Sequence, residues 1–342
     1  MNSTIMYCGA WDFKGEIKGL KAFVWDARAA QWKEKGTFGQ MTGQSILALA
    51  GSCLVSVCEL GQGGHVVSYE IREDGSLAEK DVLSFSSAKL SYVSAAPDGK
   101  HIFVSSMGDG TVKMIRVAED GKMTLTDERQ LTGHSVTPRQ NQAKVHSVMV
   151  SPNGKWLAAA NLGADEVELF RVDHETETLR LADSKGIDFG REPRHMAFHP
   201  SGDYLYVLTE GGNRLYVFTV HQGKLRELAA YETRQETGEQ KGAAADIVVS
   251  RDGKRIYTSN RGQNNIAVWR VLASGLLDLA GHCACGGQGP RGLCLSPDGS
   301  TLYAANYDSG TVTSLPIDQE TGLLRPAGQA LSVPAAGCVR VK

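Results

Sequence analysis

Pro200-Ser201-Gly202-Asp203 is followed directly by Tyr204-Leu205-Tyr206-Val207-Leu208, so a short turn stands before a run of residues that favour β-strands. A glycine in such a turn can adopt a positive φ, as tight connections between antiparallel strands require. The turn occurs four more times, with successive glycines 46 to 55 residues apart: Pro97-Asp98-Gly99-Lys100, Pro152-Asn153-Gly154-Lys155, Arg251-Asp252-Gly253-Lys254 and Pro297-Asp298-Gly299-Ser300. One period before Gly99, Gly51 lies within an apolar stretch and marks a sixth, degenerate copy. The chain therefore repeats one strand-turn-strand unit.

Two further strands are expected in each repeat. The third alternates and is often aromatic, as in Leu215-Tyr216-Val217-Phe218, and the fourth follows a turn such as Gly223-Lys224-Leu225. Four strands in a period of about 45 to 50 residues, without an amphipathic helix, are typical of a β-propeller.

The two ends of the chain supply one more blade. Residues 337–341 look like an isolated first strand, whereas residues 5–8 and 20–25 look like second and third strands. We therefore expect an all-β, seven-bladed propeller with four antiparallel strands per blade, formed by residues 1–342 as a single domain. Its terminal blade is expected to combine residues from about 1–38 with 336–342. Pairing of the N- and C-terminal strands would close the ring and cover an exposed sheet edge.

Composition excludes several classes of partner. The 36 Lys and Arg residues nearly balance the 38 Asp and Glu residues, so the net charge of −2 gives no reason to bind nucleic acid or an anionic membrane. No apolar run is long enough to cross a bilayer, and the N-terminus lacks an export signal, so we expect a cytoplasmic protein. The odd number of cysteines, seven, fits a reducing compartment.

Propeller geometry indicates where a functional site would lie. The first residue of each blade's first strand and the end of its second strand face the same mouth of the central channel. Eight residues before the turn glycines stand Gly43, Ser91, His146, Arg194, Ala245 and Arg291; eight residues after them stand Glu59, Met107, Leu162, Glu210, Arg261 and Tyr307. His195 and Asp246 stand one residue further into their strands. The charged residues and histidines of this set predict cationic groups for an anionic substrate, and a carboxylate or imidazole that moves a proton.

A structural role is the alternative for the same residues. Arg194 and Arg291 could pair with Glu210 and Asp246 as an ion-pair ring across the channel, and a single histidine at the start of a strand is often only structural.

Two other motifs do not indicate a cofactor. Residues 287–292 fit the dinucleotide pattern GxGxxG, but a strand follows them where a helix would be needed. His282, Cys283 and Cys285 have no second cluster to complete a zinc site. We therefore expect no metal and no nucleotide cofactor, and catalysis by general acid and base with arginine stabilising charge.

Four motifs resemble those of the lactonase family of seven-bladed propellers, which includes the cycloisomerase-type 6-phosphogluconolactonases and the fungal carboxymuconate cyclases. They are the segment 190–200 (GREPRHMAFHP), Ala244-Ala245-Asp246-Ile247, Ser259-Asn260-Arg261-Gly262 and Gly289-Pro290-Arg291-Gly292. The resemblance runs from about residue 63 to 318 and is strongest from Val145 onward.

This resemblance implies a set of site residues. The positions that match the family's proposed catalytic and substrate-binding set are His146, Arg194, Glu210 and Arg261, with Arg291 beside them. His195, Asp246 and Glu59 join them as substrate-binding candidates from the positional count. Residues 161–165 read NLGAD where many relatives read DLGAD, and Tyr307 stands where relatives often have Gln.

The resemblance implies hydrolysis of a sugar lactone, with 6-phosphogluconolactone as the expected substrate. Glu210 or His146 would be the base that activates water, Arg194 would stabilise the oxyanion, and Arg261 with Arg291 would hold a phosphate or carboxylate. The alternatives are lactonisation of a muconate-type diacid by the same groups and a noncatalytic ligand-binding or scaffold propeller.

Overall fold

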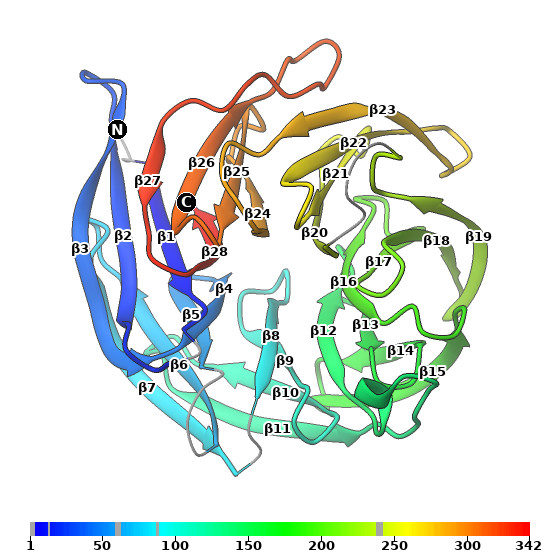
Figure 1. Cartoon of the computed structure of the whole chain (residues 1–342). Coiled ribbons are helices and arrows are strands. Elements are labelled where there is room, and N and C mark those ends of the chain that lie inside the picture. The colour runs from blue at the N-terminus through cyan, green and yellow to red at the C-terminus, as the bar shows by residue number, and fades with distance from the viewer. Residues whose placement is uncertain (1–3, 13, 59–62, 87–88, 237–241) are drawn as a thin grey trace.

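Seven four-stranded antiparallel sheets form a ring around a central channel (Figure 1). The computed structural model describes residues 4–12, 14–58, 63–86, 89–236 and 242–342. Each sheet is one blade, with its first strand nearest the channel and its fourth strand on the outside, as the strand labels in Figure 1 show. The structure confirms the predicted seven-bladed β-propeller.

The strands fall into four concentric sets. The innermost strands are β4 (Gln44–Ala50), β8 (Leu90–Ala95), β12 (Val145–Val150), β16 (Pro193–Phe198), β20 (Ala244–Val249), β24 (Pro290–Leu295) and β28 (Ala336–Val341). The second strands are β5 (Cys53–Cys58), β9 (His101–Ser106), β13 (Trp156–Asn161), β17 (Tyr204–Thr209), β21 (Arg255–Asn260), β25 (Thr301–Asn306) and β1 (Ile5–Ala10). The third strands are β6 (Gly64–Ile71), β10 (Thr111–Val117), β14 (Glu166–Asp173), β18 (Arg214–His221), β22 (Asn265–Val271), β26 (Thr311–Pro316) and β2 (Lys18–Asp26). The outer strands are β7 (Leu77–Phe85), β11 (Met123–Gln130), β15 (Thr178–Gly186), β19 (Lys224–Glu232), β23 (Leu277–Ala284), β27 (Ala330–Ser332) and β3 (Gln31–Thr42).

The terminal blade is assembled from both ends of the chain. Strand β28 pairs antiparallel with β1, with Met6 opposite Val341 and Cys8 opposite Val339. This pairing closes the ring and gives both strands a neighbour, as predicted. The outer strand β3 of this blade extends to Thr42, a few residues further than the sequence suggested.

Packing between neighbouring sheets forms the core. The second strand β13 shows the arrangement, because Leu157, Ala158, Ala159 and Ala160 are all fully buried although successive side chains point to opposite faces. Both faces of the sheet are therefore covered by adjacent blades. The outer strands instead mix buried and exposed residues, as β7 does, so the stability of the ring depends mainly on its inner three layers.

One backbone irregularity recurs at the channel. In every blade the innermost strand carries one extra residue relative to its partner at its channel-mouth end, which is a β-bulge. In β12, for example, Val145 pairs with Asn161 and Ser147 with Ala160, so His146 is the extra residue. In the described residues the only helix is the short 3-10 helix η1 (Pro138–Gln140), so no described helix is long enough to cross a membrane.

The first full blade shows where the positional count was wrong. Gly43 precedes β4, whereas the extra residue of that strand is Ser45. The turn between β4 and β5 contains only Gly51 and Ser52. Counting eight residues back from Gly51 therefore reaches Gly43, two residues before the bulge residue Ser45.

Candidate active site at one mouth of the channel

The bulges place the predicted side chains. His146, Arg194 and Arg291 are the extra residues of β12, β16 and β24. In β20 the irregularity spans Ala245 and Asp246. A bulge re-aims the side chain that it carries and ends regular pairing. The same local backbone thus brings residues about one blade apart in sequence to the same end of the channel.

Glu210 is at the centre of a cluster of arginines. It directly follows β17, and its backbone N–H donates to the carbonyl of Glu192 at 2.9 Å. Its Oε1 accepts a hydrogen bond from Arg261 Nη2 at 3.0 Å, and its Oε2 accepts one from Arg139 Nη2 at 3.2 Å. Arg194 Nε lies 3.4 Å from the same Oε2. One carboxylate therefore faces three guanidinium groups.

This environment fixes the charge of Glu210. Burial alone would raise its pKa, but Arg194 and Arg261, helped by His146 and Arg139, hold the pKa of this carboxyl well below its usual range. Glu210 is consequently a carboxylate at any physiological pH. A carboxylate that is already bound by several arginines is a poor proton acceptor.

Arg194 is a buried cation. Its residue is 1% exposed, and its Nη1 donates to the carbonyl oxygen of Ala245. Burial lowers its pKa to about 10, and the nearby Arg261 acts in the same direction, so it remains protonated at neutral pH. Its Nε has no hydrogen-bond partner within the described part of the chain.

Arg261 is fixed by backbone as well as by Glu210. It follows β21, its Nε donates to the carbonyl of Ala243 at 3.1 Å, and its Nη2 also donates to the carbonyl of Ala244 at 3.2 Å. These contacts orient the guanidinium group without using all of its five N–H donors.

Arg139 belongs to the site but was not predicted. It lies in η1, and its Nη1 donates to Glu192 Oε2 at 3.0 Å while its Nη2 reaches Glu210. Glu192 in turn has positive φ and is held by a hydrogen bond from its N–H to Asp165 Oδ1 at 2.6 Å. The connection between β11 and β12 is not part of the repeat, so the repeat register could not identify Arg139. Its length and its basic residue were the available signals.

His146 is a neutral imidazole in the site. It is buried, and its Nδ1 has no hydrogen-bond partner within the described residues. Burial, followed by the charge of Arg194 and by His195, lowers its pKa well below the usual value for histidine. The ring is therefore unprotonated at neutral pH, with the capacity to accept a proton.

His195 and Asp246 form a buried pair next to His146. His195 Nδ1 lies 2.7 Å from Asp246 Oδ1, and Asp246 also accepts hydrogen bonds from the backbone N–H groups of Ile247 at 2.9 Å and Leu293 at 2.7 Å. A carboxylate bound in this way leaves Nδ1 of His195 as the donor. Burial and Arg194 lower the pKa of His195 to about 4. The rings of His195 and His146 meet edge to face, with centroids 5.2 Å apart.

Arg291 is held differently from the other arginines. Its guanidinium carbon lies 3.5 Å from the ring centroid of Trp11 and 5.3 Å from that of Tyr307. Aromatic faces stabilise a cation without neutralising it. Trp11, which follows β1, was not predicted from the sequence because the terminal blade has no turn motif to count from.

The structure thus places the predicted residues in two groups. His146, Arg194, Glu210 and Arg261 form one cluster with His195 adjoining it, and Asp246 binds His195. Arg291 lies between Trp11 and Tyr307. Glu59 lies outside the described residues. The alternative ion-pair ring is present in one part, the pair of Arg194 with Glu210, whereas Asp246 pairs with a histidine.

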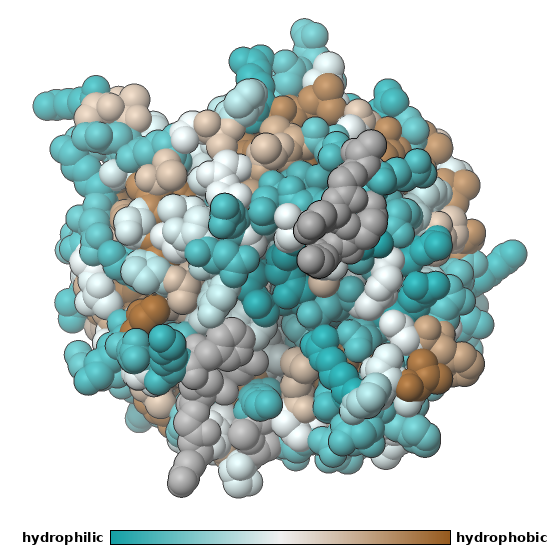
Figure 2. Space-filling model, in the orientation of Figure 1, coloured by the Kyte–Doolittle hydropathy of each residue, from teal (hydrophilic) through white to brown (hydrophobic). Residues whose placement is uncertain are grey.

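The surface around the channel agrees with a polar site. Figure 2 views the ring along its axis and shows mainly hydrophilic residues around its centre. A cavity of about 520 Å³ lies in the channel and extends to the other mouth, since its lining includes Pro97, Pro152 and Pro297 of the turns there, together with Tyr92, Asp246 and Arg340. Because Asp246 both lines this cavity and binds His195, the pair connects the cavity with the arginine cluster.

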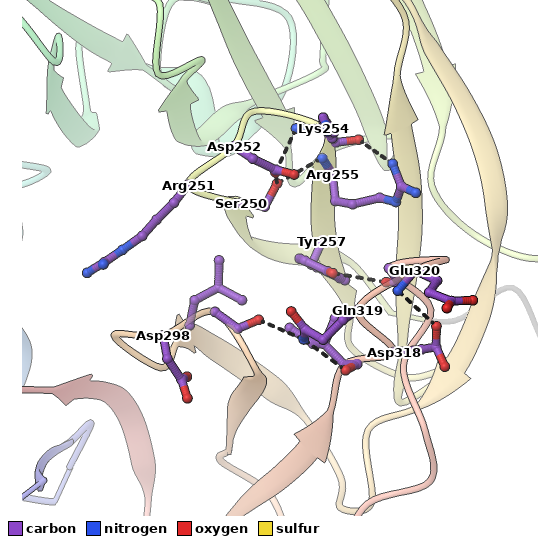
Figure 3. Close-up of a pocket in the computed structure, with 14 residues that line it drawn as sticks. Ser250, Arg251, Asp252, Lys254, Arg255, Tyr257, Asp298, Asp318, Gln319 and Glu320 are labelled. Atoms are coloured by element: carbon purple, nitrogen blue, oxygen red, sulfur yellow. Dashed lines mark hydrogen bonds between the residues drawn. The ribbon is translucent and has the colours of Figure 1, made fainter.

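A second pocket lies beside the channel cavity, with which it shares Arg251 and Leu295. It has a volume of about 290 Å³ and is formed by the turn near Asp252 and the loop near Asp318 (Figure 3). Its polar groups serve the local turns: Asp252 accepts from the Lys254 N–H at 3.0 Å, and the Tyr257 hydroxyl donates to the Gly322 carbonyl at 2.9 Å. Its described lining residues include no histidine or cysteine. We therefore locate the candidate site at the channel mouth.

His282, Cys283 and Cys285 also serve local contacts. His282 Nε2 lies 2.9 Å from the Thr233 carbonyl, and Cys285 Sγ lies 3.2 Å from the Gly287 carbonyl.

The arrangement at the channel mouth suits a particular chemistry. Among the residues that the structure describes, Arg139, Arg194 and Arg261 outnumber the carboxylates with which they form ion pairs, Glu210 and Glu192. The surplus positive charge attracts an anion, and guanidinium groups bind phosphate or carboxylate through paired N–H donors. The neutral His146 beside them supplies a proton acceptor.

Comparison with known proteins identifies the family. The model of the family described as "Lactonase, 7-bladed beta-propeller" matches residues 6–341. The chain is 28% identical to a 6-phosphogluconolactonase of Formosa agariphila, covering 98% of this chain and 99% of the relative, and 27% identical to a 6-phosphogluconolactonase of Bacillus subtilis, covering 99% of each. The solved structure of the periplasmic gluconolactonase PpgL of Pseudomonas aeruginosa superposes with a TM-score of 0.90 at 25% identity, covering 99% of each chain. The chain belongs to the lactonase family of seven-bladed β-propellers.

Proposed function

We propose that the protein hydrolyses a phosphorylated sugar lactone, 6-phosphogluconolactone, to 6-phosphogluconate without a metal ion at the reaction centre. Membership of the lactonase family supports lactone hydrolysis as the reaction class. Two relatives that align with this chain over nearly their full length are named 6-phosphogluconolactonase, which supports the phosphorylated substrate. The observation that carries the proposal is the three guanidinium groups around Glu210, with the neutral His146 beside them.

His146 is the proposed general base. The sequence left Glu210 and His146 as equal candidates, but Glu210 is bound by arginines and its pKa is depressed, whereas His146 is neutral. An anionic substrate next to Arg194 would offset the charge of this arginine, which is one of the effects that lower the pKa of His146, and so would make the imidazole a stronger base in the complex.

The proposed reaction has two proton transfers. His146 accepts a proton from water while the water oxygen attacks the lactone carbonyl, and Arg194 stabilises the oxyanion that forms. When the tetrahedral intermediate collapses, the bond to the ring oxygen breaks and the imidazolium of His146 gives the proton to that oxygen. The ring opens to a hydroxy acid, which then ionises. No covalent intermediate is required, because a sugar δ-lactone is already reactive toward water.

Glu210 is proposed as a positioning residue. Its contacts with Arg139, Arg194 and Arg261 hold three long side chains in one geometry. Fixed donors stabilise developing charge better than mobile ones, because they need no reorganisation during the reaction. Arg139, the most exposed of the three, and Arg261 are the proposed ligands of the phosphate.

The protein is proposed to work in a reducing compartment. All seven cysteines are free, including the buried Cys8 and Cys338. This agrees with the cytoplasmic location expected from the sequence, although the neighbour PpgL is periplasmic by name.

The test is a comparison of two lactones. Purified protein is assayed with 6-phosphoglucono-1,5-lactone and with glucono-1,5-lactone, and ring opening is followed by NMR against the spontaneous rate. We expect a kcat/KM at least about 10² higher for the phosphorylated lactone, since a phosphate held by two arginines contributes several charge-assisted hydrogen bonds. Equal values for both lactones would refute the phosphate specificity, and no rate above the spontaneous one with either would refute the lactonase proposal.

A further inference from the structure

Three potential metal ligands converge on the opposite mouth of the ring. Asp98 lies in the turn between β8 and β9, His101 begins β9, and His174 directly follows β14. Successive strands run in opposite directions, so the turn after a first strand and the turn after a third strand lie at the same mouth. Arg194 and Glu210 lie at the other end of the corresponding strands.

The ligand atoms lie at distances suitable for a common metal ion. His101 Nδ1 lies 2.6 Å from Asp98 Oδ2, His174 Nδ1 lies 3.2 Å from the same oxygen, and the two Nδ1 atoms lie 3.3 Å apart. Ligands bound tetrahedrally to zinc at 2.0–2.1 Å lie about 3.3 Å from each other. Two of the three separations match that value, and the third requires only a small movement of the exposed Asp98.

The outer contacts of both rings determine which nitrogen atoms face inward as acceptors. His174 Nε2 lies 2.9 Å from the carbonyl oxygen of Gly154, and His101 Nε2 lies 3.0 Å from Glu177 Oε1. Carbonyl and carboxylate oxygens only accept hydrogen bonds, so both Nε2 atoms carry the proton in a neutral ring. Each Nδ1 then presents a lone pair to the other and to Asp98 Oδ2. Three acceptors that face one another are stabilised by a metal ion or by a proton between them.

The supporting contacts are those of a metal site. A metal-bound histidine commonly donates its second N–H to a carboxylate or a carbonyl, as both rings do here. Glu177 is itself held by Arg116, whose Nη1 lies 2.9 Å from Oε2. Asp98 Oδ1 accepts hydrogen bonds from the backbone N–H groups of Lys100 and His101 at 2.8 and 3.1 Å, which leaves Oδ2 for the cluster.

The cluster is open to solvent on one side and joins two blades. His101 is buried, but the side chains of His174 and Asp98 are each about one third exposed, at 33% and 32%. Asp98 and His101 belong to the blade β8 to β11, whereas His174 belongs to the blade β12 to β15. An ion bound here would be reached from solvent and would connect neighbouring blades.

We propose that Asp98 Oδ2, His101 Nδ1 and His174 Nδ1 bind one Zn²⁺ ion, with water as the fourth ligand, and that this ion links two blades at the mouth opposite the candidate active site. Two imidazoles and one carboxylate favour a borderline divalent transition metal over Mg²⁺ or Ca²⁺, which prefer oxygen ligands only. The site stabilises the ring and takes no part in lactone hydrolysis.

The experiment measures metal binding by the full-length protein. The protein is stripped with a chelator, dialysed and titrated with ZnCl₂ by calorimetry, and with CoCl₂ by visible absorption. We expect one Zn²⁺ per chain, a tetrahedral Co²⁺ spectrum that Zn²⁺ abolishes, and a Tm raised by a few degrees in saturating Zn²⁺. A cluster held by a bound proton instead of a metal would show no saturable uptake up to about 100 µM Zn²⁺, and this result would overturn the proposal.

Matched variants locate the ion. His174→Gln and Asp98→Asn each remove one ligand, and Asn at position 98 keeps an oxygen for the backbone hydrogen bonds of the turn. Both should weaken Zn²⁺ binding at least about tenfold and abolish the Co²⁺ spectrum. His221→Gln is the control, because His221 is exposed at the corresponding hairpin of the next blade. Unchanged binding in both ligand variants, or an equal loss in the control, would exclude this site.

Discussion

Arg261 Nη2 lies 3.0 Å from Glu210 Oε1, although the two residues are 51 positions apart and belong to neighbouring blades. Glu210 makes the corresponding contact with Arg194 within its own blade, at 3.4 Å. Glu210 therefore connects two sheets of the candidate site, and the spacing of the site's arginines depends on this one carboxylate. Several expected results follow from this dependence.

Glu210→Gln should reduce both activity and stability. The amide keeps the shape but removes the charge that balances the buried Arg194, and removing one partner of a buried ion pair costs about 3–5 kcal/mol. We expect kcat/KM to fall about 10²-fold and the Tm to fall with it. Glu34→Gln, at an exposed ion pair on the outer strand β3, is the control and should change neither. A lower Tm together with an inactive wild-type protein would favour the scaffold alternative.

Arg194→Ala and Arg139→Ala should affect different kinetic constants. Arg194 is buried next to His146 and is assigned to the oxyanion, so its loss should lower kcat by about 10² or more. Arg139 is 42% exposed and is assigned to the phosphate, so its loss should mainly raise KM. Steady-state kinetics separate the two effects, with Arg270→Ala on the outside of the ring as the control. Identical changes in kcat and KM for the two variants would contradict these roles.

His146→Asn should lower kcat by about 10² to 10⁴, the range for a general base. Burial and Arg194 lower the pKa of His146, so the imidazole stays neutral as the pH falls through 6.5. The kcat/KM of the wild type should therefore remain level from pH 7.5 to 6.5 and decline only at lower pH. Rates corrected for spontaneous hydrolysis check this, and a decline centred on pH 6.5 would indicate an ordinary, solvated histidine as the base.

Acid should destabilise the fold through His195. Burial and Arg194 lower its pKa to about 4 in the folded state, whereas an unfolded histidine has a pKa of about 6.5. Between these values the unfolded chain binds more protons, so the free energy of unfolding should fall as the pH falls from 6.5 to 4, by roughly 3 kcal/mol at most from this residue. Burial would raise the pKa of Asp246, but His195 lowers it below its usual value. Protonation of Asp246 should therefore lower the free energy of unfolding further below pH 4.

Urea unfolding at pH 7.5, 6 and 5 measures this effect. In His195→Gln the free energy of unfolding should depend less on pH between 6.5 and 4 than in the wild type. His134→Gln, a change at an exposed histidine, should leave the pH dependence of the free energy of unfolding unchanged. An unchanged slope in His195→Gln would assign the acid sensitivity to other groups.

Chelation should separate stability from catalysis. Removing bound metal should lower the Tm by a few degrees if Zn²⁺ links Asp98, His101 and His174, while lactone hydrolysis at 25 °C stays the same. The groups assigned to catalysis are arginines, which do not ligate metals, and a histidine at the other mouth. Activity that is lost to the chelator and restored by Zn²⁺ or Ca²⁺ would contradict the metal-free reaction.

The sequence predicted the fold and the position of much of the candidate site because both follow the repeat. The turn glycines recur at nearly constant spacing, so counting from Gly154, Gly202 and Gly299 reaches His146, Arg194 and Arg291. Counting from Gly51 failed because that turn is shorter. Contacts between segments outside the repeat, or between blades, could not be found by this count.

Arg139 and the cluster of His101 with His174 are such contacts. Arg139 comes from a connection outside the repeat. His101 and His174 come from adjacent blades and are separated by 73 residues. Burial of Arg194 was also not predictable, because the count gives the mouth that a side chain faces and not how deeply neighbouring loops cover it.

All seven innermost strands share the β-bulge, so the bulge positions at the channel mouth are related to one another by rotation about the channel axis. The extra residue is His146, Arg194 or Arg291 in some blades and Ser45, Ser91 or Gly337 in others. Each occupies an equivalent position about the channel axis at a different azimuth. A divergent or engineered relative could therefore move a basic or imidazole group from one azimuth to another by exchanging single residues, and so reshape its substrate preference without redesigning a loop.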